Sequence, residues 1–126
     1  MKIQASAEDY LETILILGKE NGRVRAVDIA HHMNFSKPTV SIIMKQFKEN
    51  GYVEIGADRY IQLTEKGAKI AKRTYERHLL ITKVLVAIGV DKETALADAC
   101  KIEHNLSDTS FECIKNFYED CLRRGL

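Results

Sequence analysis

The sequence of 126 residues is poor in residues that interrupt regular structure. Pro38 is its single proline, its seven glycines are scattered, and tryptophan is absent. Few chain breakers favour helices joined by short turns, and they exclude a proline-rich linker or a low-complexity tract. Hydrophobic residues make up 45% and charged residues 29% of the chain, a composition typical of a globular protein with a packed core.

Long apolar runs and paired cysteines are also lacking. No stretch approaches the ~18 apolar residues of a membrane span, and Met1–Ser6 holds no apolar segment of signal-peptide length. We therefore expect a cytoplasmic protein. Cys100, Cys113 and Cys121 are odd in number and lack the spacing of a disulfide framework, so we expect reduced thiols. The interpretation of Cys113 and Cys121 is that they pack against neighbouring side chains.

Positive charge is concentrated in the middle of the chain, although the net charge is only +1. Residues 36–73 contain eight Lys or Arg against four Asp or Glu. A basic middle between more acidic ends suits a face that meets a polyanion, and a merely solvated surface would give the same charge count.

Hydrophobic periodicity predicts six helices and one hairpin. Ser6, Ser36, Asp91 and Ser107 are candidate helix N-caps, and Pro38 falls in a first turn, where its missing N–H is harmless. The helices are expected at about 6–20, 26–33, 37–49, 64–87, 92–104 and from 108, and the strands at 52–55 and 60–63. This order predicts a mainly α-helical protein, with a winged helix-turn-helix over residues 1–72 and a helical domain over 73–126 that shares the long helix from about residue 64.

The segment 27–53 has the layout of a helix-turn-helix, in which the second helix enters the major groove of DNA. Its first residues, Ser36, Lys37, Pro38, Thr39, Val40 and Ser41, would face base edges. Lys45, Lys48 and Arg59, the last in the turn of the wing, would contact phosphates. The alternative is a winged helix used only for protein contacts, with lysines that solubilise it.

Potential metal donors occur in three separate stretches: Asp9 and Glu12, then His78, then Cys100, Glu103 and His104. Within the first and third stretches the spacing of three or four residues places the donors on one helix face. Mixed oxygen, nitrogen and sulfur donors suit first-row transition metals. The alternatives are acids favoured by a helix dipole, an ordinary partly buried histidine and a core thiol.

Six motifs in register resemble the diphtheria toxin repressor family, particularly its manganese transport regulator branch, over essentially the whole chain. They are Asp9-Tyr10-Leu11-Glu12, Val27-Asp28-Ile29-Ala30, Lys37-Pro38-Thr39-Val40-Ser41, Leu63-Thr64-Glu65-Lys66-Gly67, Arg77-His78 and Ile102-Glu103-His104-Asn105-Leu106-Ser107. The resemblance implies a dimeric repressor with Mn²⁺ or Fe²⁺ as co-repressor. By position, the family's ligands fall on Asp9, Glu12, His78, Cys100, Glu103 and His104.

The chain departs from the manganese branch at Cys100, where that branch usually has a glutamate and the iron-responsive branch a cysteine. A carboxylate can bridge two hard cations, whereas a thiolate shifts the preference toward softer ions such as Fe²⁺, Co²⁺ or Zn²⁺. The second site of the iron branch is not expected, because Thr82 and Leu96 stand where its further ligands would be. Nor is the SH3-like domain of that branch expected after Leu126.

Apolar residues after Gly89 exceed what a winged helix alone would bury, so we expect a homodimer on a palindromic operator in double-stranded DNA. They are Leu96, Ile102, Phe111, Ile114 and Phe117. The sequence thus predicts a metal-dependent transcription repressor that controls metal homeostasis and is not an enzyme. One rival is a winged-helix regulator that ignores metals. The other is a small metalloenzyme with Glu12 or Glu103 as general base.

Overall fold

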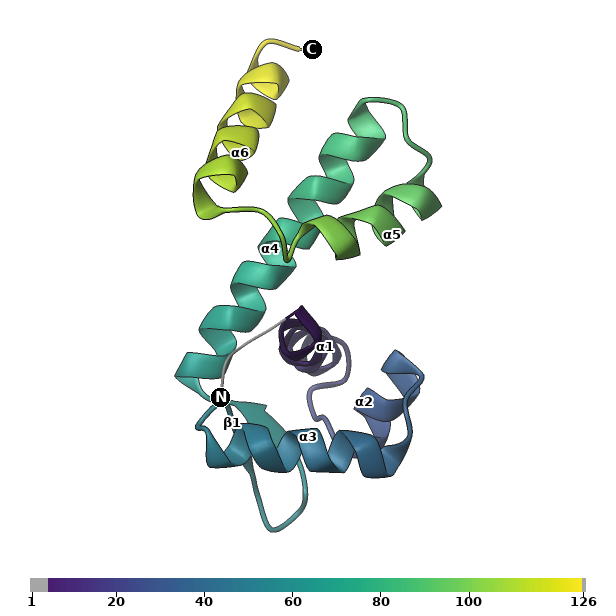
Figure 1. The fold of residues 1–126 in the computed structure, drawn as a ribbon, viewed down its shortest axis with the longest axis vertical. Helices are drawn as coiled ribbons and strands as arrows, with labels where there is room; N and C mark the ends of the chain where they lie inside the picture. The colour runs from purple at the N-terminus through teal and green to yellow at the C-terminus, as the bar shows by residue number, and fades with distance from the viewer. Residues whose placement is uncertain (1–4, 126) are drawn as a thin grey trace. The chain divides into compact units, whose positions relative to one another are not determined.

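The structure is a computed structural model that describes residues 5–125. The segment Met1–Ser6, in which no signal peptide is expected, lies partly outside the described residues, because these begin at Ala5. The described chain contains six helices and one antiparallel hairpin, so the predicted fold class is confirmed. In order they are α1 (Ala5–Asn21), α2 (Ala26–Met33), α3 (Lys37–Glu49), β1 (Val53–Ile55), β2 (Ile61–Leu63), α4 (Glu65–Ala87), α5 (Lys92–Ile102) and α6 (Asp108–Arg123) (Figure 1).

The chain forms two compact units, Met1–Thr74 and Tyr75–Leu126. The first holds α1 to β2 and the beginning of α4, and the second holds the rest of α4 with α5 and α6. The boundary between the units, after Thr74, lies close to the one expected from the sequence, after residue 72. Among the described residues, no helix is both long enough and apolar enough to span a lipid bilayer.

The first unit is built around a core shared by α1, α2, α3 and the hairpin. Leu11, Ile29, Val40 and Phe47 are completely buried, at the positions that helical periodicity assigns to the inner faces. In the hairpin, Val53 pairs with Leu63 and Ile55 with Ile61. The core therefore fixes both the recognition helix α3 and the wing that follows it.

The junction between the wing and α4 explains the motif Thr64-Glu65-Lys66-Gly67. The Thr64 hydroxyl donates to the carbonyl oxygen of Gly51 at 2.6 Å and accepts from the backbone N–H of Gly67 at 3.1 Å. A Cβ atom at Gly67 would overlap the carbonyl oxygen of Tyr52. Glycine is thus required where the first turn of α4 crosses the start of β1.

Three of the four predicted caps are confirmed. The side chains of Ser36, Asp91 and Ser107 accept from the backbone N–H three residues on, at 3.3, 3.0 and 3.1 Å. Ser6 is wrong as a cap, because it lies inside α1. Several bounds also differ from the prediction: each strand is one residue shorter, and α5 ends at Ile102, so that the turn carrying Glu103 follows the helix.

In the second unit, α5 and α6 are seen on opposite sides of α4 (Figure 1). Phe111 on α6 is only 6% exposed, and its ring lies 5.1 Å from the guanidinium carbon of Arg77 on α4. Phe111, one of the apolar residues counted in favour of a dimer, thus packs within its own chain. Leu96, Ile102 and Phe117 are exposed.

Candidate metal centre and nucleic-acid interface

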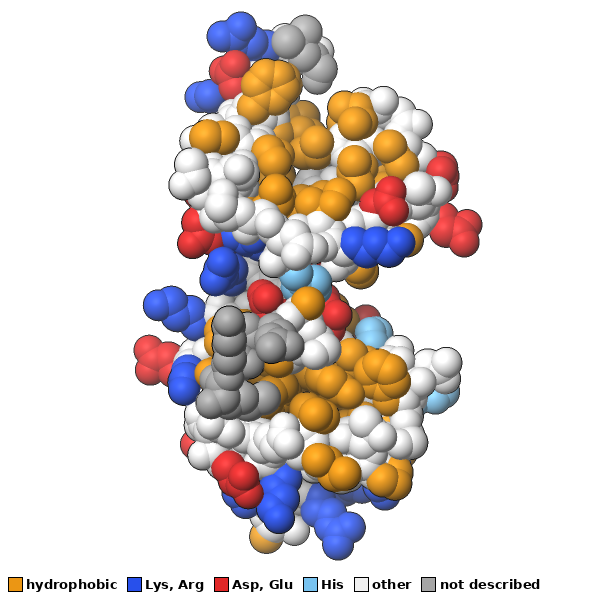
Figure 2. Space-filling model, in the orientation of Figure 1, with side chains coloured by type: hydrophobic (Ala, Val, Ile, Leu, Met, Phe, Trp, Pro, Cys, Tyr) orange, Lys and Arg blue, Asp and Glu red, His pale blue; other side chains and the backbone are white. Residues whose placement is uncertain are grey.

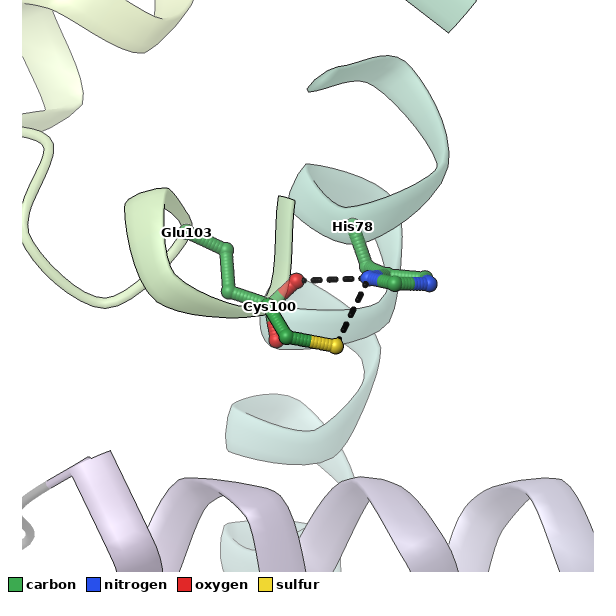
Figure 3. Close-up of side chains that lie close together, drawn as sticks. All are labelled: His78, Cys100 and Glu103. Atoms are coloured by element: carbon green, nitrogen blue, oxygen red, sulfur yellow. Dashed lines mark hydrogen bonds and ion pairs between the residues drawn. The ribbon is translucent and has the colours of Figure 1, made fainter. Parts of the chain in front are cut away.

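Three donor residues of the second unit lie close together. His78 comes from α4, Cys100 from the last turn of α5, and Glu103 from the turn that follows. The Nδ1 atom of His78 lies 2.9 Å from Oε2 of Glu103 and 3.7 Å from Sγ of Cys100. Figure 3 shows both contacts meeting at the same ring nitrogen.

The carboxylate of Glu103 is the most deeply buried part of this cluster. Glu103 is 1% exposed, and its Oε1 atom accepts no hydrogen bond from the described residues. The Nε2 atom of His104 lies 3.4 Å from that oxygen. Burial of an ionised carboxylate is costly unless a cation or hydrogen bonds compensate it. A bound divalent ion would supply that compensation.

The separations also fit a metal centre. Bonds from first-row ions to nitrogen, oxygen and sulfur are about 2.0–2.3 Å long, so donors that share one ion lie about 3–4 Å apart. The donor atoms of His78, Cys100 and Glu103 all lie within 4.8 Å of one another. An imidazole, a thiol and a carboxylate together suit a divalent transition metal, so the residues present fit the ion that the resemblance implies.

One alternative for the isolated residues can now be judged. Cys100 is exposed, which excludes the core thiol considered from the sequence. Thr82, which stands where a further ligand of the iron branch would be, donates its hydroxyl proton to the carbonyl oxygen of His78 at 2.7 Å. Asp9 and Glu12 belong to the first unit, one turn apart on α1, and Glu12 is buried.

Eight of the nine residues predicted to meet DNA are exposed: Ser36, Lys37, Pro38, Thr39, Ser41, Lys45, Lys48 and Arg59. The prediction is wrong for Val40, which is completely buried because it packs into the core of the first unit. In Figure 2, Lys and Arg side chains gather along the lower edge of the first unit, around α3 and the hairpin. The hydroxyls of Ser36 and Thr39 share a hydrogen bond of 2.8 Å, so the cap holds two candidate base-reading groups in place.

Arg59 occupies an unusual position in the hairpin turn. Its φ is 68°, in the left-handed region where glycine is the more common residue. A charged side chain at the tip of the wing is thus kept despite a backbone preference against it. Such a conflict between local preference and residue type is a pointer to function.

The sequence patterns missed three exposed residues on the same unit. Ile42, in the middle of α3, is 60% exposed although its neighbours Val40 and Met44 are buried. Arg23 and Arg25 lie over the ring of Tyr60, at 4.9 and 4.5 Å from its centroid. Both arginines precede the segment in which positive charge was counted, and the fold brings them to Tyr60 in the turn of the wing, the residue after Arg59.

A winged helix-turn-helix with a basic edge, followed by a helical unit with a buried carboxylate beside imidazole and thiol groups, defines a metal-responsive DNA-binding regulator. Comparison with known families gives the particular family. Residues 2–60 match the N-terminal DNA-binding domain of the iron dependent repressors, and residues 64–123 match their metal binding and dimerisation domain. The chain belongs to this family of metal-dependent transcription repressors, which confirms the sequence prediction and excludes an enzyme.

Individual relatives agree with this assignment. The chain is 40% identical to an HTH-type transcriptional regulator of Methanocaldococcus jannaschii, over 90% of this chain and 93% of that protein. It is 36% identical to the HTH-type transcriptional regulator MntR of Bacillus subtilis, over 94% of this chain and 87% of that protein. It also resembles the solved structure of the manganese regulator SloR, with a TM-score of 0.77, 27% identity and coverage of 94% of this chain. The match covers 55% of the SloR chain, so this chain spans little more than half of its length.

Proposed function

We propose that this protein is a cytoplasmic repressor of metal-uptake genes, for which Mn²⁺ or Fe²⁺ is the co-repressor. The observation that carries the proposal is the convergence of His78, Cys100 and Glu103 in a chain that also holds a DNA-reading winged helix. The solved relative SloR is a manganese regulator, which supports manganese, while the thiol of Cys100 supports a softer ion such as Fe²⁺.

His78, Cys100, Glu103 and His104 would hold the ion from the second unit, and Asp9 and Glu12 would complete its coordination from α1. Ligands from both units can bind one ion only in those arrangements that bring them together. The ion therefore favours such arrangements over all others, by the difference in its affinity for them. This is how metal binding would change the placement of the winged helix and with it the affinity for DNA.

The homodimer expected for a family with a dimerisation domain would form on an apolar groove of the second unit. The groove lies between the end of α4 and α6 and encloses about 500 Å³. Ile88 and Phe117 on its walls are 73% and 72% exposed. In Figure 2 hydrophobic side chains gather in the middle of the visible face of this unit. Large exposed apolar patches of this kind typically mark interfaces, and we propose that a second copy packs here.

Two copies related by a two-fold axis would present their α3 helices to successive major grooves, about 34 Å apart, on a palindromic operator. Ser36, Lys37, Pro38, Thr39 and Ser41 would read base edges. We add Ile42, whose exposed side chain suits contact with the C5-methyl group of thymine. Lys45, Lys48, Arg59, Arg23 and Arg25 would contact phosphates.

The test is DNA affinity measured by fluorescence anisotropy, on a palindromic duplex selected from random sequence in the presence of Mn²⁺. Tight, salt-sensitive binding with Mn²⁺ or Fe²⁺ and weak binding with chelator support the proposal. Equal affinity in both conditions would identify a winged-helix regulator that ignores metals. Phe117→Glu should yield a monomer by analytical ultracentrifugation, and a persistent dimer would exclude the groove as the interface.

A further inference from the structure

Arg77, the residue before His78 on α4, has a buried side chain that reaches the turn after α5. Arg77 is 3% exposed. Its Nη1 atom donates to the carbonyl oxygens of Glu103, at 3.1 Å, and Leu106, at 2.6 Å, while Nη2 donates to Oδ1 of Asp108 at 2.6 Å. A single guanidinium group thus contacts the first residue of the segment 103–108, its last residue, and Leu106 between them.

These contacts satisfy groups that the local fold leaves without partners. The last carbonyl groups of a helix have no partner within it, and α5 ends at Ile102. Arg77 supplies hydrogen-bond donors to two carbonyl oxygens of the turn, and Asp108 compensates its charge. Burial of an arginine is tolerated when the group is paired in this way, and its planar fork suits several acceptors at once.

Glu103 is held at both ends by consecutive residues of α4. Arg77 holds its main-chain carbonyl oxygen, and the ring of His78 contacts its carboxylate at 2.9 Å. Without Arg77 the turn would lose two hydrogen bonds next to the residue whose carboxylate must meet the ion. The orientation of ligands by neighbouring groups is a general determinant of metal affinity.

We propose that Arg77 is a positioning residue of the metal centre, which fixes the turn 103–107 so that the Glu103 carboxylate faces His78 before the ion arrives. The proposal rests on the proposed metal-binding function. It assigns to Arg77 a role in affinity and ligand geometry through Glu103, with no direct contact to the ion.

The chain offers a matched control on the same two helices. Lys115 on α6 donates to Glu76 on α4 at 2.9 Å, so it also ties α6 to α4 by an ion pair. That pair lies on the surface and contacts neither Glu103 nor its turn. Lys115→Met removes a link between α4 and α6 while leaving the candidate centre intact.

The test is an anaerobic Co²⁺ titration of the reduced, full-length protein, followed by the absorption bands of the bound ion. Arg77→Lys keeps the charge and loses the fork, so we expect about 10–100-fold weaker Co²⁺ binding and altered bands. Lys115→Met should retain wild-type affinity and bands. Asp108→Asn weakens one of the Arg77 contacts, so its Co²⁺ affinity should lie between those of Arg77→Lys and Lys115→Met.

Circular dichroism of each variant establishes that it is folded. Folded Arg77→Lys protein with wild-type affinity and spectrum would overturn the positioning role while leaving the metal site in place. If Arg77→Lys does not fold, wild-type Co²⁺ affinity of the surface variant Asp108→Asn overturns the role instead. A wild-type chain that binds neither Co²⁺, Mn²⁺ nor Fe²⁺ would overturn the proposed function itself.

Discussion

The Nδ1 atom of His78 lies 2.9 Å from the Oε2 atom of Glu103, although 25 positions separate the two residues in the chain. The contact joins α4 to the turn after α5 and directs a buried carboxylate at an imidazole. Together with the thiol of Cys100, this pair forms the candidate centre on which the proposed regulation depends.

Loss of the imidazole should weaken metal binding while leaving the fold intact. We expect His78→Gln to lower the affinity for Co²⁺ or Mn²⁺ by about 10–100-fold or more, because it removes the donor that both other groups contact. Isothermal titration calorimetry measures this. His32→Gln is the control, since His32 is an exposed histidine on α2 in the other unit. Equal losses in the two variants would argue against a specific role for His78.

Replacement of the thiol should change which metal is preferred. Cys100→Glu introduces the residue usual in the manganese branch, so we expect the ratio of Mn²⁺ to Co²⁺ affinity to rise. The thiolate-to-cobalt charge-transfer band of the wild type should disappear in the same variant. Cys113→Ser, at an exposed cysteine on α6, should preserve both the band and the ratio. If the metal ranking is the same with Cys100 and with Glu at that position, the thiol does not determine selectivity.

Much of the fold could be predicted from the sequence because the signals are local. Ser36, Asp91 and Ser107 are caps because each side chain meets a backbone N–H three residues on, a contact that needs no tertiary structure. The alternation of Val53 to Ile55 and Ile61 to Leu63 similarly predicts the hairpin. Ser6 has the same residue type as two true caps, but the helix begins before it.

The candidate site could be predicted only in part. Cys100 and Glu103 belong to one local pattern, and His78 was a separate candidate donor that the resemblance placed in the same ligand set. The role of Arg77 could not be foreseen, because its partners lie 26 to 31 positions away and two of them are main-chain carbonyls, which are common to every residue. The packing of Phe111 could not be foreseen for a similar reason: its apolar character does not tell whether it packs within its chain or against a partner.

The close approach at the wing makes a strong prediction about stability. Gly67→Ala should lower the free energy of unfolding by about 2–3 kcal/mol, because the added methyl group overlaps the carbonyl oxygen of Tyr52 and forces the backbone to move. Gly18→Ala is the matched control. A methyl group at Gly18 meets nothing within 4 Å, and the helix interior favours alanine by about 0.5–1 kcal/mol. Urea denaturation should therefore show opposite signs for the two variants, and similar shifts would contradict the proposed overlap.

Ile42 should read thymine methyl groups on the operator. Replacement of thymine by uracil removes only the C5-methyl group, so one such change per half-site should weaken wild-type binding by about 5-fold or more. Ile42→Ala protein should bind the thymine and uracil duplexes equally well, as measured by anisotropy. Exposed Gln46, one turn further along α3, serves as a control through Gln46→Ala. A uracil penalty that persists in Ile42→Ala would assign the contact to another side chain.

Asp91 should make α5 sensitive to acid. The backbone N–H of Thr94, and next its side chain, donate hydrogen bonds that lower the pKa of Asp91. A pKa lowered by folding means that the stabilisation is present above the unfolded pKa of about 3.9 and is lost as the pH falls through the folded value. Asp91→Asn keeps a good cap without the titration. The difference in urea midpoint between wild type and Asp91→Asn should therefore shrink from pH 6 to pH 3, and a constant difference would contradict the assignment.

Coupling between metal and operator is the central claim, and reciprocal binding measurements test it most directly. The affinity for Mn²⁺ or Fe²⁺ is measured by calorimetry with and without a saturating palindromic duplex. We expect the duplex to tighten metal binding by the same factor by which the metal tightens DNA binding, about 5–150-fold, because linkage requires the two factors to be equal. His78→Gln should abolish this mutual tightening of metal and DNA binding. The same metal affinity in the presence and absence of the duplex would contradict the account.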